Sequence, residues 1–275
     1  MARYQHTLAD GDPEAVAIRN AATVMIVRDE PRFEVLMVKR TSRVAFAASA
    51  WVFPGGRVDD EDVNEASQEV TGLTDAEASK MLDLDAGGLA WWIAGVRETV
   101  EEAGLLLVDA ESNPTPAAID AVRDAVHADS GLLVPTLREH DLRIDLSLMH
   151  EVARFITPLG PPRRFDTRFF LALAPHDQVV TPDEGEVVEA KWIEPGHALE
   201  LWHAEEFPLM SVTHRMLACL RRYTSAAEVM HHAKTRPETR RVRVNDPDGE
   251  YHVLLPEDPG YEDAELEIEH GWVRL

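Results

Sequence analysis

Short apolar runs bounded by polar, turn-forming residues occupy the first sixty positions and predict β-strands. Residues 21–27 are almost continuously apolar, and a second run at residues 33–40 follows a short charged connection. Two such runs joined by a short polar segment are typical of a β-hairpin. A third run at residues 51–53 stops at a Pro-Gly-Gly sequence, where we expect a glycine turn.

Helix-like and strand-like patterns share the rest of the chain. The sequence Thr-Asp-Ala-Glu from Thr74 predicts a helix start. Residues 91–103 are expected to form a helix that ends at Gly104, because glycine enters the left-handed conformation easily. Apolar residues recur at helical spacing in residues 116–127. Further strands are expected at 105–108, 152–157, 165–174 and 187–193, helical material at 196–232, and a terminal hairpin at 241–244 and 251–255.

Strands combined with segregated helices favour an α+β fold or a layered α/β/α domain. With 275 residues, the chain can bury a sizeable core as one large domain or two small ones. Apolar residues make up 45% of the chain and charged residues 28%, which is the balance of an ordinary globular protein.

The net charge of the chain is -23, from 50 acidic and 27 basic residues. So acidic a surface repels phosphates and argues against a nucleic-acid-binding protein. No stretch approaches the ~18 consecutive apolar residues of a membrane span, and the polar first twenty residues predict no secretory signal. Cys219 is the single cysteine, which excludes an internal disulfide and favours a reducing, cytoplasmic location.

Three glutamates carry the clearest candidate chemistry. Glu98, Glu101 and Glu102 stand at i, i+3 and i+4 in the predicted helix, so their carboxylates share one face. Like charges at this spacing destabilise a helix slightly, but a hard divalent cation such as Mg²⁺ reverses that penalty. Arg97, four residues before Glu101, can orient one carboxylate. A solvated acidic helix face is the alternative interpretation, and the core-facing stripe is expected to be Val96, Val100 and Ala103.

These residues resemble the Nudix box, whose pattern is Gly-x5-Glu-x7-Arg-Glu-U-x-Glu-Glu-x-Gly-U, with U apolar. The second half matches over residues 97–105, with Thr99 as a departure in the first apolar slot. The first half begins at Gly56 and places its acid at Asp62, with Glu61 beside it. An uninterrupted box would place its arginine at position 70, whereas it stands at 97, so about 27 residues are inserted.

The long insertion is similar to that of the Nudix branch that includes the peroxisomal coenzyme A diphosphatase of animals. This resemblance extends upstream to Arg40 and Phe46 and downstream to residues 155–158 and 164–170. It covers most of residues 20–195 and implies a Nudix fold, an α/β/α sandwich with a mixed sheet.

The resemblance also implies a division of the chain. Residues 1–200 are expected to form the Nudix domain, and residues 201–275 a helical and hairpin extension packed on the same domain. Because both half-boxes keep their residues, we expect residues 60–90 to loop out as a helical insertion. The glycine turn would then lie against the acidic helix.

The activity that the resemblance implies is hydrolysis of a diphosphate joined to another moiety, with Mg²⁺ or Mn²⁺ as the cofactor. Glu98, Glu101 and Glu102 would then be the metal ligands. Catalytic roles fall to Glu102, which would tune the attacking water from an exposed position, and to Glu101 oriented by Arg97. A general base on a later loop is the alternative, with Glu184 or Glu186 as candidates, and a solvated loop competes with that interpretation.

Substrate recognition is expected from basic residues beside the glycine turn. Arg40, Arg43 and Arg57 would bind phosphate together with the turn residues Gly55 and Gly56. Ordinary salt bridging with the plentiful acids is the alternative. Further basic candidates are Lys39, Arg163, Arg164 and Arg168.

A second motif of the coenzyme A-cleaving members is only partly present. Thr41, Ala45 and Ser49 stand where that motif has a small residue, an arginine and a glycine, and Arg43 is two positions early. Loss of one charged hydrogen bond weakens phosphate binding by roughly 1.5–3 kcal/mol, which is about a ten- to hundred-fold loss of affinity. We therefore expect poor activity toward coenzyme A and a preference for another diphosphate. Asp120 supports neither ADP-ribose nor dinucleoside polyphosphate selectivity.

Two other classes of function compete with a hydrolase. A Nudix fold can serve as a ligand-sensing or regulatory module after catalysis is lost, but that alternative predicts eroded box glutamates, whereas all three are present. A scaffold in which the insertion and the tail bind partners is the third class. The expected partner is a small-molecule diphosphate, not nucleic acid or a membrane. A homodimer is compatible with the sequence, which does not determine the oligomeric state.

Overall fold

The computed structural model describes residues 12–42, 48–65, 72–109, 111–245, 251–264 and 271–275. Within these residues nine strands form one mixed sheet in the order β3-β2-β1-β6-β5-β11-β8, with β4 paired to β1 and β7 paired to β2. The strands of this sheet are β1 (Ile18–Asp29), β2 (Phe33–Arg40), β3 (Trp51–Val52), β4 (Gly55–Arg57), β5 (His150–Ile156), β6 (Arg164–Leu173), β7 (Val187–Ile193), β8 (Arg240–Arg241) and β11 (Gly271–Val273).

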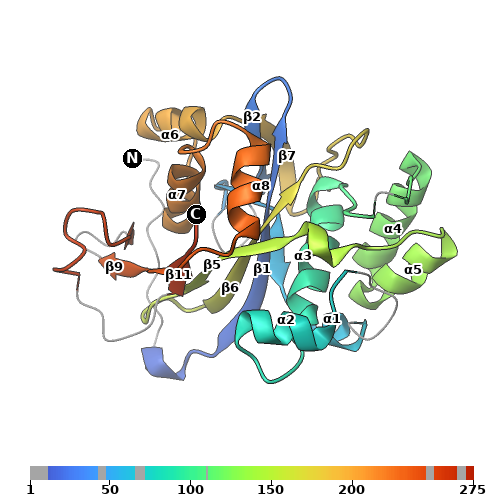
Figure 1. Ribbon diagram of the computed structural model, residues 1–275, viewed down its shortest axis with the longest axis horizontal. Coiled ribbons are helices and arrows are strands. Elements are labelled where there is room, and N and C mark those ends of the chain that lie inside the picture. The colour runs from blue at the N-terminus through green and yellow to red at the C-terminus, as the bar shows by residue number, and fades with distance from the viewer. Residues whose placement is uncertain (1–11, 43–47, 66–71, 110, 246–250, 265–270) are drawn as a thin grey trace.

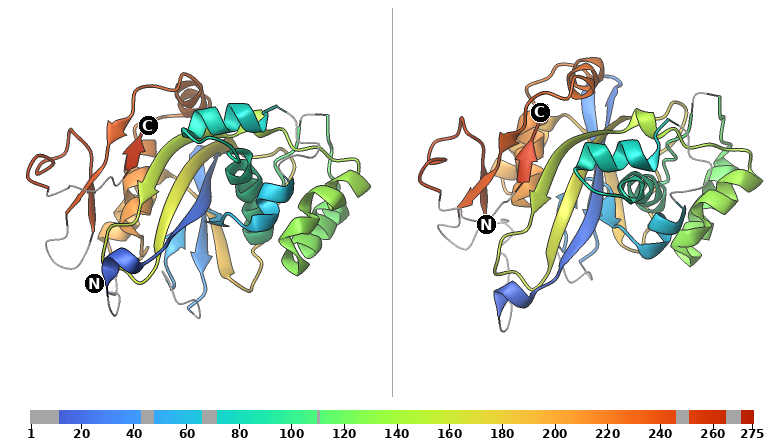
Figure 2. Two further views of the ribbon diagram at one scale, coloured as in Figure 1. Left: turned by 90° about the horizontal axis from the view of Figure 1, so that it is seen from below. Right: turned by 60° about the horizontal axis from the view of Figure 1, so that its bottom comes forward.

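Helices cover both faces of the sheet (Figures 1 and 2). One face carries α3 and the other carries α6, α7 and α8, so the molecule has the three layers expected of an α/β/α sandwich. The helices are α1 (Asp60–Glu65), α2 (Asp75–Leu82), α3 (Leu89–Ala103), α4 (Pro116–Ala128), α5 (Leu133–Glu139), α6 (Pro195–His203), α7 (Ser211–Leu220) and α8 (Ala226–Lys234).

The long strand β1 forks the sheet. It runs parallel to β6 over ten residue pairs, from Ile18 with Arg164 to Val27 with Leu173. On its other side it pairs with β2 only near its end, at Val27 with Val35, and with β4 further back, at Ala22 with Gly56. The predicted β1–β2 hairpin is thus confirmed. The Val24 amide donates to the Pro54 carbonyl oxygen at 2.8 Å, so the chain between β3 and β4 lies beside β1.

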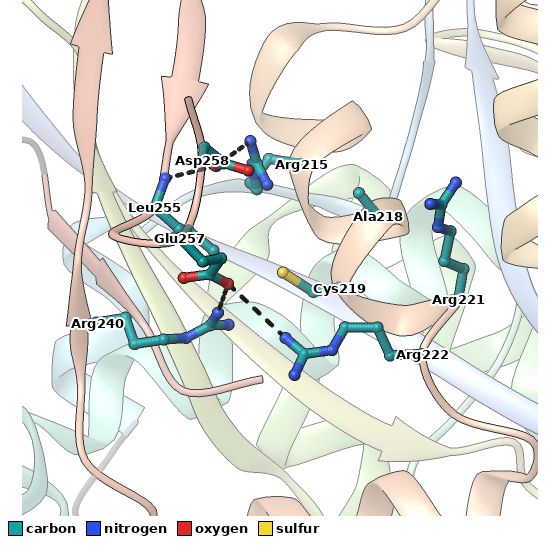
Figure 3. Close-up of a pocket in the computed structure, with 9 residues that line it drawn as sticks. All are labelled: Arg215, Ala218, Cys219, Arg221, Arg222, Arg240, Leu255, Glu257 and Asp258. Carbon is teal, nitrogen blue, oxygen red and sulfur yellow. Dashed lines mark hydrogen bonds and ion pairs between the residues drawn. The ribbon is translucent and has the colours of Figure 1, made fainter. Parts of the chain in front are cut away.

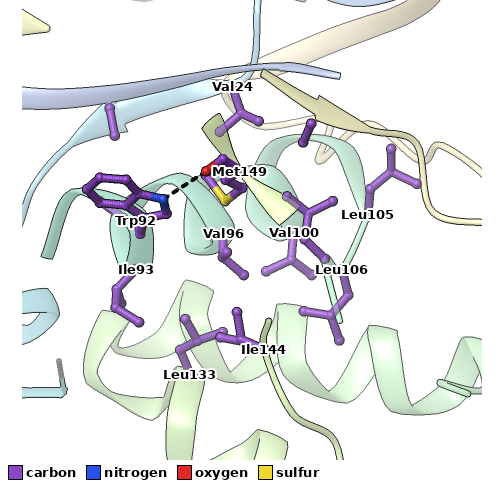
Figure 4. Packing of buried hydrophobic residues seen from close by; sticks show 14 of the residues in the cluster. Val24, Trp92, Ile93, Val96, Val100, Leu105, Leu106, Leu133, Ile144 and Met149 are labelled. Atoms are coloured by element: carbon purple, nitrogen blue, oxygen red, sulfur yellow. Dashed lines mark hydrogen bonds between the residues drawn. The ribbon is translucent and has the colours of Figure 1, made fainter. Parts of the chain in front are cut away.

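The helix α3 packs on one face of the sheet through its apolar stripe. Val96, Val100 and Ala103 are fully buried, as predicted from their spacing. Figure 4 shows this stripe between Val24 of the sheet and a second layer that includes Leu133. Apolar burial of this kind contributes about 25 cal/mol per Å², so the packing fixes the opposite, acidic face of α3 in place.

The predicted helix start at Thr74 and the predicted helix end at Gly104 are both confirmed. The Thr74 hydroxyl accepts a hydrogen bond from the Glu77 amide, and the Glu77 carboxylate accepts one from the Thr74 amide, which is a capping box. The helix α3 ends at Gly104, whose φ of 66° places it in the left-handed region.

The strand predicted at residues 105–108 is wrong. Leu105, Leu106 and Leu107 are buried, but they belong to no strand. The side-chain amide of Gln178 takes the place of a neighbouring strand, since it accepts a hydrogen bond from the Leu106 amide at 2.8 Å and donates one to the Leu106 carbonyl at 2.9 Å. A buried apolar run can therefore satisfy its backbone without joining a sheet.

The C-terminal segment contributes helices, a hairpin and an extra strand. In the hairpin, β9 (Arg243–Asn245) pairs with β10 (His252–Leu254), which confirms a hairpin here, while residues 246–250 of its expected turn lie outside the described residues. The strand β11 adds to β5 antiparallel, with Trp272 opposite Arg154. In the part of the chain that the structure describes, no helix is long and apolar enough to cross a membrane.

Candidate functional site

The two halves of the interrupted motif meet in the structure. The Gly55 amide donates a hydrogen bond to Glu102 Oε2 at 2.9 Å. A Cβ atom added at Gly56 would lie 2.3 Å from Glu98 Oε1, so a larger residue would displace the Glu98 carboxylate from its place beside the turn. Arg97 Nη2 donates to the Arg57 carbonyl oxygen at 2.8 Å. The prediction that the half-boxes are spatial neighbours is confirmed.

Helical segments connect the two halves. The helix α1 follows the glycine turn directly and packs against α3, and α2 also contacts α3 before the chain enters it. The insertion at residues 60–90 therefore contains a helix on each side of residues 66–71, which lie outside the described part. Its first turn brings Asp62 into the interior, with 1% of its surface exposed, next to Arg97.

Arg97 is the centre of a buried ion cluster. Its side chain is 2% exposed, and it binds Asp62 through Nε and Nη2, each at 2.9 Å. Nη1 donates to Glu98 Oε1 at 2.9 Å and to Glu101 Oε2 at 3.0 Å. A planar guanidinium presents five donors in a fixed geometry, so it can bind several carboxylates in defined directions at once. Asp59 Oδ2 lies 3.8 Å from Nη2, so the expected pairing with Glu101 is one of four acidic contacts.

Glu102 is buried, which corrects the expectation of an exposed carboxylate. Only 5% of the residue is exposed, because the glycine turn and Arg40 cover its side chain. Burial, followed by repulsion from Glu98, raises its pKa well above the usual range. Glu102 is therefore a buried acidic residue whose charged form is unfavourable in the folded protein.

The other two glutamates are shifted in the same direction. Burial raises the pKa of Glu98 to about 6, despite the opposing effect of Arg97. Burial and the charge of Glu98 raise the pKa of Glu101 to about 8. Three carboxylates that are hard to ionise together form a site where a divalent cation would relieve both desolvation and repulsion.

The carboxylate oxygens of Glu98, Glu101 and Glu102 are suitable ligands for a hard divalent cation, but these side chains would have to change rotamer to enclose one. Within the described residues, no three acidic, histidine or cysteine side chains converge closely enough to enclose an ion as they stand. Arg97 holds Glu98 and Glu101 while Glu102 accepts from Gly55. Cation binding would therefore draw Glu98 and Glu101 away from Arg97, which keeps Asp62 as its partner.

Thr99, the departure in the first apolar slot of the motif, is fully buried. Its hydroxyl donates to the Gly95 carbonyl oxygen one turn earlier at 2.8 Å. Threonine can bond to its own helix in this way, so its polar atom needs no partner from the core. The substitution therefore leaves the acidic face of α3 unchanged.

Arg40 is the basic residue that reaches the glutamates. Its guanidinium lies 3.8 Å from Glu102 Oε1 and 3.8 Å from Glu186 Oε2, and its buried Nε has no hydrogen-bond partner. Glu186 lines the same cleft with a side chain that is 68% exposed, whereas Glu184 does not line it. Arg40 therefore places an N–H group that has no hydrogen-bond partner beside the acidic face of α3.

The other basic candidates divide into two groups. Arg57 lies at the rim, paired with Asp59 at 3.0 Å, and Arg163 also lines the cleft. Lys39 points to the other face of β2 and pairs with Glu189. Arg164 binds the Thr157 carbonyl oxygen and Arg168 pairs with Glu151 in the interior, so both point away from the cleft. Arg43 falls outside the described residues.

A cleft of about 940 Å³ joins these residues, within the size range of small-molecule sites. Sequence reasoning missed Asp59 and Arg19, which also line it. Arg19 could have been found from the sequence, because every second residue of a strand points to the same face. Arg19 therefore shares a face of β1 with Ala21 and Thr23, which both line the cleft. Ser49, where the coenzyme A motif has glycine, has a φ of 62°, the conformation that favours glycine.

Arg123 of α4 was also missed, and it fixes the end of α3. Its Nε and Nη2 donate to the Glu101 carbonyl oxygen at 3.0 and 2.9 Å, and Nη1 donates to Thr181 Oγ1 at 3.1 Å. Carbonyl groups in the last turn of a helix lack partners within the helix, so this contact satisfies one of them.

We expect Arg123→Met to lower the free energy of unfolding by about 1.5–3 kcal/mol, the contribution of a hydrogen bond to a charged group. Urea unfolding of the variant measures this change. Arg221→Met, at an exposed arginine beyond the end of α7, is the control and should shift the midpoint little. Equal midpoints for Arg123→Met and wild type would show that Arg123 does not hold α3.

A second pocket, of about 540 Å³, lies between α7 and the C-terminal segment (Figure 3). Its arginines are largely neutralised from within, since Arg215 pairs with Asp258 at 2.7 Å and Arg222 lies 3.9 Å from Glu257. Burial raises the pKa of the Cys219 thiol at its base, which excludes a reactive thiolate there. These contacts tie the tail to α7.

The layered fold and the rejoined motif define the Nudix hydrolases, a class that generally uses divalent metals. Residues 74–211 match the family model of the NUDT19 Nudix domain, which is half of the chain, so the chain belongs to this family. The match begins after the glycine turn and Asp62, and the structure brings both of these into contact with α3.

Similar proteins agree with this membership. Acyl-coenzyme A diphosphatase NUDT19 of Xenopus laevis is 26% identical over 206 residues, 61% of this chain and 54% of that protein. Putative nudix hydrolase 7 of Caenorhabditis elegans is 30% identical over 196 residues, 70% of this chain and 56% of that protein. The chain spans about half the length of these curated relatives. A solved NUDIX hydrolase from Alicyclobacillus acidocaldarius is 28% identical with a TM-score of 0.64, covering 79% of this chain and 97% of its own.

Proposed function

We propose that the protein hydrolyses the diphosphate linkage of a nucleoside diphosphate derivative, with coenzyme A or an acyl-coenzyme A as the leading substrates. The observation that carries this proposal is the meeting of Glu102 with the glycine turn, beside Arg40, at the base of the cleft. Relatives named acyl-coenzyme A diphosphatase support this substrate class, against the preference for another diphosphate that the incomplete coenzyme A motif predicts.

In this proposal the acidic face of α3 holds the cofactor and Arg40 holds the substrate. Glu98, Glu101 and Glu102 would bind Mg²⁺ or Mn²⁺, which neutralises diphosphate charge and activates water when bound. Arg40 and Arg57 would donate to phosphate oxygens, while the turn lets the substrate approach the backbone at Gly55 and Gly56. Arg97 keeps Glu98 and Glu101 oriented until the cation binds them, and Glu186 at the rim is the candidate general base.

We also propose that residues 1–200 carry this chemistry as the Nudix domain with its insertion at 60–90. Residues 201–275 would be an extension of the same domain. The burial of α7 and α8 against the sheet supports one continuous core and not a separate second domain.

A hydrolysis screen over diphosphate compounds tests the proposed activity. Coenzyme A, acyl-coenzyme A, ADP-ribose and dinucleoside polyphosphates would each be incubated with Mg²⁺ and with Mn²⁺, and the products identified by mass. Metal-dependent cleavage within the diphosphate is the expected result. Binding without cleavage of any of them would assign the protein to the alternative class of ligand-sensing modules.

We expect Arg40→Ala to lower kcat/KM by about ten- to hundred-fold, because a charged hydrogen bond to phosphate contributes about 1.5–3 kcal/mol. Lys39→Ala is a matched control, since it removes the neighbouring positive charge from the opposite face of the strand. The control should leave kcat/KM within two-fold of wild type. Equal losses in the two variants would show that only general charge attraction is at work.

A further inference from the structure

An excess of positive charge surrounds the carboxylate of Glu151, which is fully buried and lies away from the cleft. Three guanidinium groups from different elements contact its two oxygens, and they belong to Arg168, Arg236 and Arg274. Among the residues that the structure describes, no second carboxylate pairs with any of the three. This group therefore carries three positive charges against one negative charge, in a chain whose net charge is -23.

The positive charge continues outward to the end of α8. Burial, followed by the charges of Lys234 and Arg236, lowers the pKa of His150, whereas none of the charges that act on His150 is negative. Lys234 is exposed and has no ion pair within the described part of the chain. Burial and the charge of Arg236 also lower the pKa of Arg274, despite the nearby carboxylate of Glu151. The cations therefore repel one another more than a single carboxylate can offset.

Two buried nitrogen atoms in this region, Arg168 Nε and His150 Nε2, have no hydrogen-bond partner among the described residues. Only 3% of Arg168 is exposed. Its two Nη atoms are already used, since Nη1 donates to Glu151 Oε1 at 2.8 Å and Nη2 donates to the Leu82 carbonyl oxygen at 3.1 Å. Buried polar atoms without a partner are rare in folded proteins, and a bound ion is one of the usual reasons for them.

Arg236 reaches this region from a strained backbone position. Its φ of 45° lies in the left-handed region, which glycine commonly occupies just after a helix end. Its Nη2 donates to the Met81 carbonyl oxygen at 3.2 Å and lies 3.5 Å from Glu151 Oε2, while 34% of its side chain is exposed. A strained residue of this kind indicates that its side chain has a role beyond ending the helix.

We propose that these basic residues form a binding site for a phosphate group, carried by inorganic phosphate or by a phosphomonoester, at the surface beside the end of α8. Phosphate oxygens would accept hydrogen bonds from the guanidinium and ammonium groups and offset their excess charge. Salt at physiological strength screens the acids elsewhere in the protein beyond about 8 Å. Arg168 and Arg236 also donate to the last carbonyl groups of α2, so a bound anion would strengthen the junction between the sheet and the helical insertion.

Titration calorimetry of the full chain with inorganic phosphate, in buffer that contains EDTA, tests this site. Without a cation, the glutamates of α3 repel phosphate from the cleft. Wild type should bind phosphate saturably, and Arg236→Gly should bind it at least about ten-fold more weakly, as expected for the loss of a charged hydrogen bond. Glycine suits the backbone at this position. A parallel titration with glycerol 3-phosphate shows which source of the phosphate group the site prefers, and binding of either one supports it.

Two control variants separate this site from other basic residues. Arg221→Gly removes an exposed arginine at the end of another helix, α7, and should keep the affinity of wild type. Arg40→Ala should keep it too, whereas a loss of binding in Arg40→Ala would place the phosphate in the cleft and overturn the proposal. Equal losses in Arg221→Gly and Arg236→Gly, or no saturable binding by wild type, would also overturn it. If Arg236→Gly does not fold, Lys234→Gln at an exposed position provides the second variant and should also weaken binding.

The pKa of His150 reports binding at the site itself. A bound phosphate should raise this pKa, because its negative charge offsets the charges of Lys234 and Arg236 that lower it. Arg236→Gly should raise the pKa of His150 without phosphate, since it removes one of those charges. Titration of the His150 ring protons by NMR, assigned with a His150→Gln variant, measures both changes. A pKa of His150 that stays the same in saturating phosphate would overturn the site, whether or not the protein hydrolyses a diphosphate.

Discussion

Glu102→Gln is expected to lower kcat by about 100- to 1,000-fold, which corresponds to roughly 3–4 kcal/mol at 1.36 kcal/mol per factor of ten. Glutamine keeps the size of the side chain, and its amide oxygen can still accept the hydrogen bond from Gly55. What it removes is the negative charge that would bind the cation and act on water. Steady-state hydrolysis with saturating Mg²⁺ or Mn²⁺ measures the loss.

The same variant should fold at least as well as wild type without metal. The pKa of Glu102 is raised by burial and by Glu98, so its charge is unfavourable in the folded state until a cation is present. For wild type, a metal concentration of 100 times the dissociation constant should add ~2.7 kcal/mol of stability, and the variant should lose most of this gain. Thermal melting with and without metal separates the two effects.

Glu61→Gln is the control for this prediction, because it removes the same charge from an exposed side chain near the motif. It should retain both activity and the thermal shift. Wild-type turnover by Glu102→Gln at saturating metal would remove Glu102 from the catalytic site. A variant that melts far below wild type without metal would instead assign Glu102 a structural role.

Local patterns predicted the elements that carry the site. The apolar spacing of Val96 and Val100 fixed the orientation of α3, and Gly104 marked its end, because both are properties of neighbouring residues on one helix. The contact between Gly56 and Glu98 also followed from the sequence, but only through the motif that both belong to. No local rule joins residues on either side of a long insertion.

Contacts between distant elements explain what the sequence did not reveal. The burial of Glu102 depends on how the glycine turn covers α3, and no helical periodicity describes that contact. Arg168 was a candidate for phosphate binding because it is basic and close in sequence to other arginines. It instead points into the interior toward Glu151, which only the pairing of β5 with β6 decides.

Glu151 is the centre of a second buried ion cluster, away from the cleft. Its carboxylate is fully buried and contacts Arg168 at 2.8 Å, Arg274 at 3.1 Å and Arg236 at 3.5 Å. Arg168 also donates to the Leu82 carbonyl oxygen at 3.1 Å. The cluster thereby joins the sheet to the helical insertion, to the end of α8 and to the last strand.

Glu151→Gln is expected to lower the free energy of unfolding by about 3–5 kcal/mol, because removing one partner leaves buried charge uncompensated. That is a large share of the roughly 5–15 kcal/mol that stabilises a typical domain. Urea unfolding measures the loss, and Glu34→Gln is the control, since its partly exposed pair with Arg28 should contribute at most about 1 kcal/mol. The folded fraction of Glu151→Gln should keep its kcat, because Glu151 does not line the cleft. A change in stability below 1 kcal/mol would show that water satisfies the three arginines once the carboxylate is gone.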